Sequence, residues 1–288
     1  MATGANNLPG AMPSISAFHY AAPAADFVAA APLLLWVACD GLQLTWCLTP
    51  EGRSAILEVG RCRLDSPAGH ALWLGEKLEE RPDILGVHWG SWSGFGLVPT
   101  GIRQPMDDRA LLELELGTVV SKTRAGEVVG TPYTVVHAVD TALESALTKV
   151  WPSIEFHCPS RLLAESFCRD ERRRTNAALL VVLRKDAARV DFCALNAGAL
   201  HALVSHPVAD VQDALYRAVH LCESQGWSRE TRILLSGDVG VIGEHARGFK
   251  AQFDKVDLYY GRFIPARGAV SAMHRQYVLS LAQMIECA

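Results

Sequence analysis

Residues 34–52 read LLWVACDGLQLTWCLTPEG, and residues 179–198 read LLVVLRKDAARVDFCALNAG. Each stretch contains an apolar strand, a short polar turn, a second strand with an aromatic residue followed by cysteine, and a turn with glycine. The two aromatic-cysteine pairs end at Cys47 and Cys193, about half of the 288-residue chain apart. A repeat of this length predicts a molecule built of two similar halves.

The composition is that of a globular protein. Hydrophobic residues make up 50% of the chain and charged residues 20%, which separates it from disordered proteins. The formal net charge of −4 gives no electrostatic reason to expect a nucleic-acid partner, because phosphate binding needs clustered Lys and Arg. The eight cysteines form no CxxC pair, so free thiols in a reducing cytoplasm are favoured over a metal site.

The N-terminal residues 1–30 are rich in Ala and Pro, and we expect a flexible leader. The apolar stretch from Ala21 to Ala38 is not typical of a signal peptide, since the first Lys or Arg of the chain is Arg53. Asp26 interrupts this stretch, and the remaining run is too short to span a bilayer. The sequence therefore predicts a cytoplasmic protein without a transmembrane segment.

The first domain is expected at residues 31–170. Three strands in succession are followed by a helix at residues 67–80 and a strand at residues 84–89, because the apolar runs alternate with turn residues such as Asp-Gly. An excursion is expected at residues 92–138. Asp140 is a plausible N-cap for the helix that follows it.

The second domain is expected at residues 176–288. Three strands again come first, then a long helix at residues 208–225, a strand at residues 231–235 and further helix and strand, with an apolar helix at residues 273–287. Both halves thus have the order of a ribonuclease-H-like domain. The predicted fold class is α/β, with two such domains in tandem and mixed sheets flanked by helices. Actin, sugar kinases and heat-shock ATPase domains share this actin-like ATPase (ASKHA) architecture.

On this pattern the sequence resembles DUF3822, a bacterial family of uncharacterised proteins with a duplicated actin-like ATPase fold. It is more distantly similar to PilM, the actin-like protein of type IV pilus assembly. The matching features are the extended segment Phe95–Pro99, the strand-helix-strand unit Tyr133–His157 and the segment RILLSGD at residues 232–238. The resemblance covers about residues 30–262.

The resemblance implies a nucleotide site between the halves. In such ATPases two DxG hairpins present backbone N–H groups to the phosphates, and a late Gly-Gly turn contacts adenosine. Here the first hairpin has Asp40 and Gly41, the second has Lys185 but no glycine, and the late turn has Gly237 and Asp238. Asp40, Gly41, Gly237 and Asp238 are therefore the candidate cofactor-binding residues. For Asp40 and Lys185 a purely structural role in the turn is favoured over a nucleotide contact. For Gly237 and Asp238 a structural turn and a nucleotide contact are equally supported.

Other chemistry finds less support. A ribonuclease-type nuclease needs several carboxylates, and Asp40 has only Glu58 as an acidic partner on the first strands. His88, His137 and His157 fall at or near strand ends, where α/β sheets often place sites, but structural roles are favoured. No catalytic residue and no metal site are assigned.

The leading hypothesis is a degenerate pseudo-ATPase that does not hydrolyse nucleotide, requires no cofactor and works by binding an unknown protein partner, through its cleft or the 92–138 excursion. The alternative is an ATP-binding protein or slow ATPase of the same fold, for which ATP and Mg²⁺ remain possible ligands. A third hypothesis, peripheral association with an envelope assembly, rests on analogy of fold alone.

Overall fold

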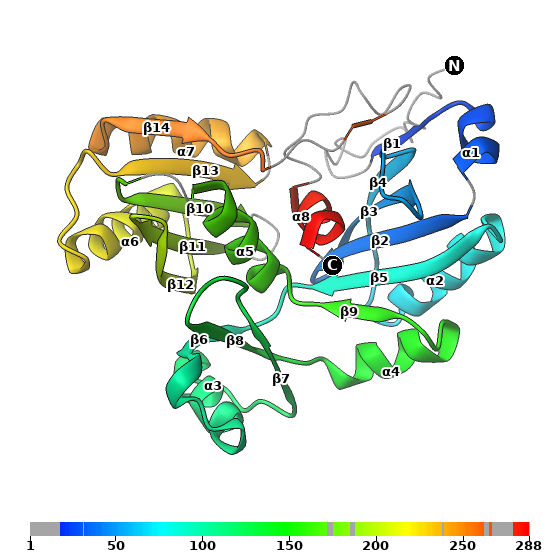
Figure 1. Cartoon of the computed structure of the whole chain (residues 1–288), viewed down its shortest axis with the longest axis horizontal. Coiled ribbons are helices and arrows are strands. Elements are labelled where there is room, and N and C mark those ends of the chain that lie inside the picture. The colour runs from blue at the N-terminus through cyan, green and yellow to red at the C-terminus, as the bar shows by residue number, and fades with distance from the viewer. Residues whose placement is uncertain are drawn as a thin grey trace.

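Two mixed β-sheets lie side by side in the molecule, and a smaller third sheet projects below the junction between them (Figure 1). The computed structural model describes residues 18–30, 32–171, 175–184, 188–237, 239–261, 265–266 and 279–287.

The first sheet has six strands in the order β1-β4-β3-β2-β5-β9. The neighbouring strands β1, β4, β3 and β2 are antiparallel to one another. Strands β5 and β9 run parallel to β2. Its strands are β1 (Phe18–Ala21), β2 (Leu33–Asp40), β3 (Gln43–Pro50), β4 (Glu58–Arg63), β5 (Ile84–Ser91) and β9 (Glu155–His157).

The second sheet repeats this arrangement with five strands in the order β12-β11-β10-β13-β14. Its first three strands are antiparallel and its last two are parallel to β10. Its strands are β10 (Ala178–Arg184), β11 (Arg189–Asn196), β12 (Ala199–Pro207), β13 (Arg232–Gly237) and β14 (Lys255–Leu258). Both sheets therefore have the ribonuclease-H-like strand order, and the predicted fold class is confirmed.

The central strands are apolar because helices cover both faces of each sheet. Helices α2 (Gly69–Glu80) and α4 (Thr141–Val150) cover one face of the first sheet, contributing Leu74 and Leu147 to its core. Helices α6 (Val211–Ser224) and α7 (Val239–Gln252) cover the corresponding face of the second sheet. Asp140 caps α4 as predicted, accepting a hydrogen bond from the backbone N–H of Leu143.

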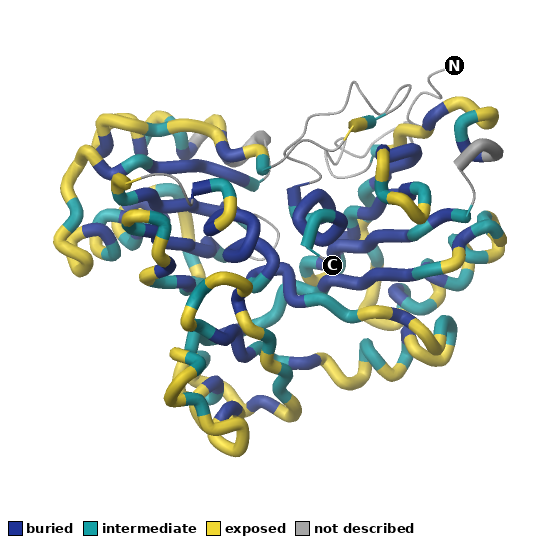
Figure 2. The backbone as a smooth tube through the Cα atoms, viewed as in Figure 1, coloured by how far each residue is buried: buried dark blue, intermediate teal, exposed yellow. Residues whose placement is uncertain are grey.

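Helix α5 (Pro159–Glu171) lies between the two sheets and is buried along most of its length. The burial of α5 is visible in Figure 2. Its Leu162 packs with the first sheet, whereas Leu163 and Phe167 pack with the second. Helix α8 (Leu279–Cys287), near the C-terminus, packs against α5 and against β2. The end of the chain thus completes the core of the sheet formed by its beginning.

The third sheet has the order β6-β8-β7 and comes from the segment expected as an excursion. It packs beside the second sheet, since Phe95, Val128 and Val135 belong to the same core cluster as α5. Its elements are β6 (Phe95–Pro99), β7 (Thr123–Glu127) and β8 (Tyr133–Ala138), with two short 3₁₀ helices, η1 (Thr100–Ile102) and η2 (Pro105–Asp107), and helix α3 (Asp108–Leu116).

Part of the stretch expected to be a flexible leader has regular structure. Residues 18–21 form β1, which pairs with β4, and α1 (Ala24–Ala30) follows it. Phe27 is buried in the first core beneath the guanidinium of Arg81, 4.2 Å from the ring centre. Apolar contacts and strand pairing thus hold a segment whose composition alone resembles a linker. Residues 1–17 lie outside the described part of the chain.

Candidate functional site

The two repeated hairpins meet through an ion pair between the halves. Arg184 ends β10 and Asp40 ends β2. The Arg184 guanidinium donates from Nε to Asp40 Oδ2 at 3.1 Å and from Nη2 to Asp40 Oδ1 at 3.0 Å, so the pair is bidentate. Its third nitrogen, Nη1, donates to Asp191 Oδ2 at 3.1 Å. One arginine therefore engages a carboxylate from each hairpin.

This arginine is deeply buried. Its side chain is 8% exposed, and its guanidinium lies 4.6 Å from the centre of the Trp92 ring. Burial disfavours its charge, but the carboxylates of Asp191 and Asp40 hold the pKa of Arg184 above its ordinary value. The Arg184 side chain is therefore a permanent cation placed where the two hairpins approach each other.

Gly41 and Gly237 have different structural reasons to be glycine. Gly41 occupies the β2–β3 turn with φ +61°, the left-handed region that glycine adopts without strain. Gly237 ends β13 with φ +123°, beside Leu183 of the parallel strand β10. A Cβ atom at residue 237 would overlap the carbonyl oxygen of Leu183. Strand packing thus accounts for Gly237 without a nucleotide. Asp238 and Lys185 lie outside the described residues.

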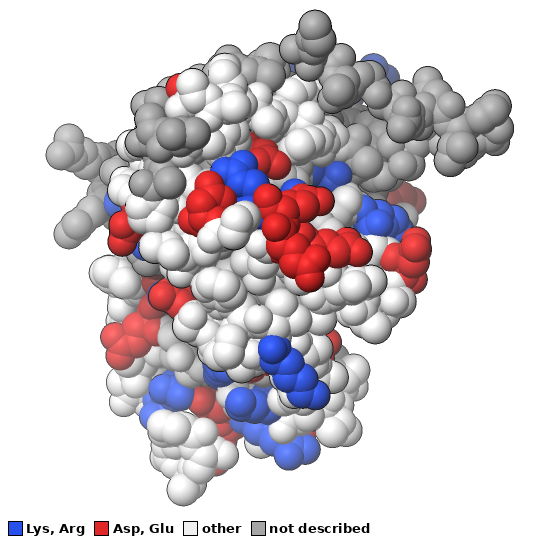
Figure 3. All heavy atoms as spheres, turned by 90° about the vertical axis from the view of Figure 1, so that its right-hand side faces the viewer, with Lys and Arg blue, Asp and Glu red and all other residues white. Residues whose placement is uncertain are grey.

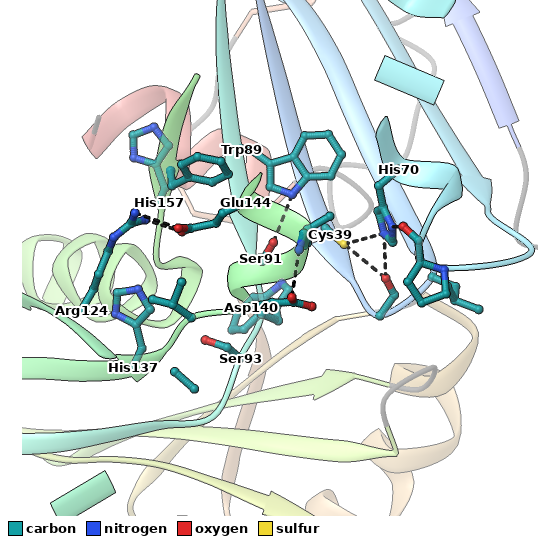
Figure 4. A pocket seen from close by; sticks show the side chains of 18 residues that line it. Cys39, His70, Trp89, Ser91, Ser93, Arg124, His137, Asp140, Glu144 and His157 are labelled. Carbon is teal, nitrogen blue, oxygen red and sulfur yellow. Dashed lines mark hydrogen bonds and ion pairs between the residues drawn. The ribbon is translucent and has the colours of Figure 1, made fainter. Parts of the chain in front are cut away.

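A cavity of about 300 Å³ lies beside the first hairpin (Figure 4). Trp89, Trp92 and Phe156 supply aromatic walls, and Ser91, His137 and Asp140 add polar groups. Arg124 and Glu144 form an ion pair at its rim. Aromatic walls with a few placed polar groups are typical of ligand sites, and this volume is near the lower end for them.

Cys39 and His70 lie together in the wall of this cavity. The Cys39 thiol donates to the carbonyl oxygen of Gly41 at 3.2 Å and lies 3.3 Å from His70 Nε2. His70 Nδ1 donates to the carbonyl oxygen of Pro67 at 2.6 Å. Burial, with the nearby Asp40, raises the pKa of Cys39 to about 12, so the thiol stays protonated. This pair therefore joins the hairpin turn to the start of α2 and does not offer a thiolate nucleophile.

Two of the three histidines noted at strand ends, His137 and His157, line this cavity. His137 lies on β8 and faces the cavity. His88 and His157 come from the neighbouring strands β5 and β9, with His88 Nδ1 3.1 Å from His157 Nε2. Burial lowers the pKa of each of the three to about 4.

The sequence pointed to Asp40 and Gly41 but not to Arg184, Trp92 or the Cys39–His70 pair. One available signal was Asp191, a charged residue within the apolar strand β11, which requires a buried partner. The candidate Glu58 of the nuclease hypothesis instead contacts His19 and Arg81.

No protein-family model matches the chain, and no curated protein matches it, so membership of DUF3822 stays a prediction. Solved structures do resemble it. One is a protein of unknown function with an actin-like ATPase fold from Bacteroides thetaiotaomicron, with 13% identity, TM-score 0.72, and coverage of 91% of this chain and 99% of that one. Another is the PilM–PilN type IV pilus biogenesis complex, with 10% identity, TM-score 0.58, and coverage of 88% and 96%. Five strands of the first sheet have the same order and directions as the five strands of the second. Together with this repeat, these similarities show that the chain has the actin-like ATPase fold.

Proposed function

We propose that this protein is a non-hydrolysing member of the actin-like fold that acts by binding a protein partner. The observation that carries the first part is the buried Arg184 between Asp40 and Asp191. Nucleotide hydrolysis in this fold needs the space between the hairpins for phosphates and Mg²⁺. Here the Arg184 guanidinium and the carboxylates of Asp40 and Asp191 lie where the described parts of the two hairpins meet.

The charge at this point also opposes a metal-nucleotide complex. An aspartate that positions Mg²⁺ must offer free oxygens, but both oxygens of Asp40 accept hydrogen bonds from Arg184. Releasing Asp40 would leave the buried guanidinium with less compensation, and breaking a buried ion pair typically costs about 3–5 kcal/mol. Binding of Mg-ATP would have to supply that free energy as well.

The test is a titration of the full chain with Mg-ATP, followed by thermal unfolding. A site filled at a hundred times its dissociation constant would add about 2.7 kcal/mol of stability. We expect no shift in the unfolding temperature at millimolar Mg-ATP. A shift that is lost in Asp40→Asn, a variant of the same shape, would establish nucleotide binding, and release of phosphate by the parent chain would then establish the slow ATPase and overturn this proposal.

The partner surface is proposed on the segment around α3. Ile102, Met106, Leu114 and Val119 are 75–85% exposed, and this segment forms the far end of the third sheet (Figures 1 and 2). Exposed apolar groups concentrated in one segment are typical of interaction sites. The PilM structure is itself a complex with PilN, which supports a protein as the partner class. An envelope assembly is one possible setting, by the same analogy.

The surface charge and the cysteines are also consistent with a protein partner in the cytoplasm. On the face seen in Figure 3, the described acidic and basic side chains lie in separate small groups without a continuous basic stripe, which favours protein over nucleic acid. None of the helices in the described parts of the chain has the length and apolar character needed to cross a bilayer. The eight cysteines are free thiols, as expected if the protein works in the cytoplasm.

The partner surface is tested by affinity capture from the source cells. We expect a protein captured by the intact chain to be lost in the double variant Met106→Asp, Leu114→Asp. Tyr216→Asp is the control, because Tyr216 is 67% exposed but lies on α6 of the second half. Equal capture by both variants would place the partner elsewhere.

A further inference from the structure

Three potential metal ligands converge at the free edge of the first sheet. His88 lies on β5, and Glu155 and His157 lie on the edge strand β9, with His88 directly beside Glu155 in the pairing. His88 Nδ1 is 3.1 Å from His157 Nε2 and 3.3 Å from Glu155 Oε2. One donor atom from each residue lies within 4.8 Å of the other two.

These separations match the edges of a coordination polyhedron. With metal–nitrogen and metal–oxygen bonds of about 2.0–2.1 Å, two ligands of a tetrahedral ion lie roughly 3.3 Å apart. The two measured separations from His88 Nδ1 are close to that value. The third separation, between the donors of Glu155 and His157, is at most 4.8 Å, so these two would have to approach each other by no more than roughly 1.5 Å.

The surroundings hold the ligands in place. The His88 ring stacks on Trp36 at 3.9 Å between ring centres and 7° between planes, and its side chain is 7% exposed. Glu155 is 65% exposed, so an ion here would keep contact with solvent on one side. A rigid inner ligand with an open outer face is typical of sites that leave a coordination position for water.

We propose that His88, Glu155 and His157 form a binding site for a divalent transition-metal ion of the zinc class. Two imidazoles and one carboxylate are borderline donors that suit Zn²⁺ and its neighbours in the series, rather than the all-oxygen sets of Mg²⁺ and Ca²⁺.

The position of the site indicates a structural role. Strand β9 has only three residues, and it leads directly into α5, the helix between the two sheets. An ion bound by His88 and by two residues of β9 would fasten this short edge strand to β5. It would thereby hold the start of α5 in place.

The experiment uses the untagged full chain, freed of metal with a chelator and titrated with Zn²⁺ by calorimetry. We expect one ion per chain, and a rise in the unfolding temperature at saturation. Glu155→Gln should weaken binding at least about tenfold, a loss seen even for outer-shell partners of metal sites. Because Glu155 is exposed and glutamine has the same shape, this variant should fold. His220→Gln, an exposed histidine on α6, is the control and should bind as the parent does.

Cobalt distinguishes this site from the free thiols. Co²⁺ bound by nitrogen and oxygen should give visible absorption without the strong near-ultraviolet band of cobalt–thiolate coordination, and His157→Gln should remove the visible bands. A thiolate band, or Zn²⁺ binding that is unchanged in Glu155→Gln and His157→Gln, would overturn the proposal. So would the absence of stoichiometric binding to the parent chain.

Discussion

At the scale of single residues, Gly237 shows how a motif residue can be retained for packing. Its φ of +123° and its closeness to the Leu183 carbonyl leave no room for a side chain. We expect Gly237→Ala to destabilise the protein by about 1–3 kcal/mol or more, the cost of overpacking and strained backbone. Urea unfolding measures this change.

The matched control is Gly243→Ala. Gly243 lies within α7, where a Cβ would meet nothing within 4 Å. Alanine should therefore be neutral or stabilise by up to about 1 kcal/mol, as expected of glycine replacement in a helix. Equal stabilities for the two variants would contradict the packing role of Gly237.

At the scale of elements, α8 belongs to the core of the first half although it lies at the other end of the chain. Met284 is fully buried among Trp36, Leu162 and Leu281, and it lies against Gly90 of β5. We expect Met284→Ala to lower the free energy of unfolding by about 2–5 kcal/mol, because it opens a cavity between helix and sheet.

Met106→Ala provides the comparison for this prediction. It makes the same chemical change at a side chain that is 85% exposed, so the expected effect is within about 0.5 kcal/mol. Urea unfolding followed by tryptophan fluorescence suits both variants, since Trp36 packs in the same cluster as Met284. A small loss in Met284→Ala would show that α8 contributes little to the first core.

At the scale of the whole molecule, buried histidines make stability depend on pH. Burial, with the charges of Arg124 and Arg161, lowers the pKa of His137 to about 4, whereas an unfolded histidine titrates near 6.5. As pH falls from 6.5 to 4 the unfolded state takes up the proton first, so stability present above pH 6.5 is progressively lost. The lowered pKa values of His88 and His157 also reduce the stability of the metal-free protein as the pH falls.

We therefore expect the chelator-treated protein to unfold at lower urea concentration at pH 5 than at pH 7.5. His137→Gln should lose less stability over this interval than the parent chain. His220→Gln, whose side chain is exposed, should lose as much as the parent. A parent whose unfolding midpoint is the same at both pH values would contradict the buried neutral state of these histidines.

The sequence alone determined the strands of the two repeated hairpins and the fold class. Residues 34–52 and 179–198 specify strand, turn and strand through local features: apolar runs, an Asp-Gly turn at the first copy and a repeated order of elements. Such patterns depend on neighbours in the chain, so they can be read without coordinates. The Asp140 cap followed from the same local chemistry.

The tertiary structure alone decided what lies between the hairpins and at the sheet edge. Asp40 and Arg184 are 144 residues apart, and His88 and His157 are 69 apart. Whether such side chains meet depends on strand order, register and the packing of α5 between the sheets, which no local pattern contains. The repeated hairpins can therefore be predicted from the sequence, whereas the ion pair between Arg184 and Asp40 depends on how the two halves are brought together.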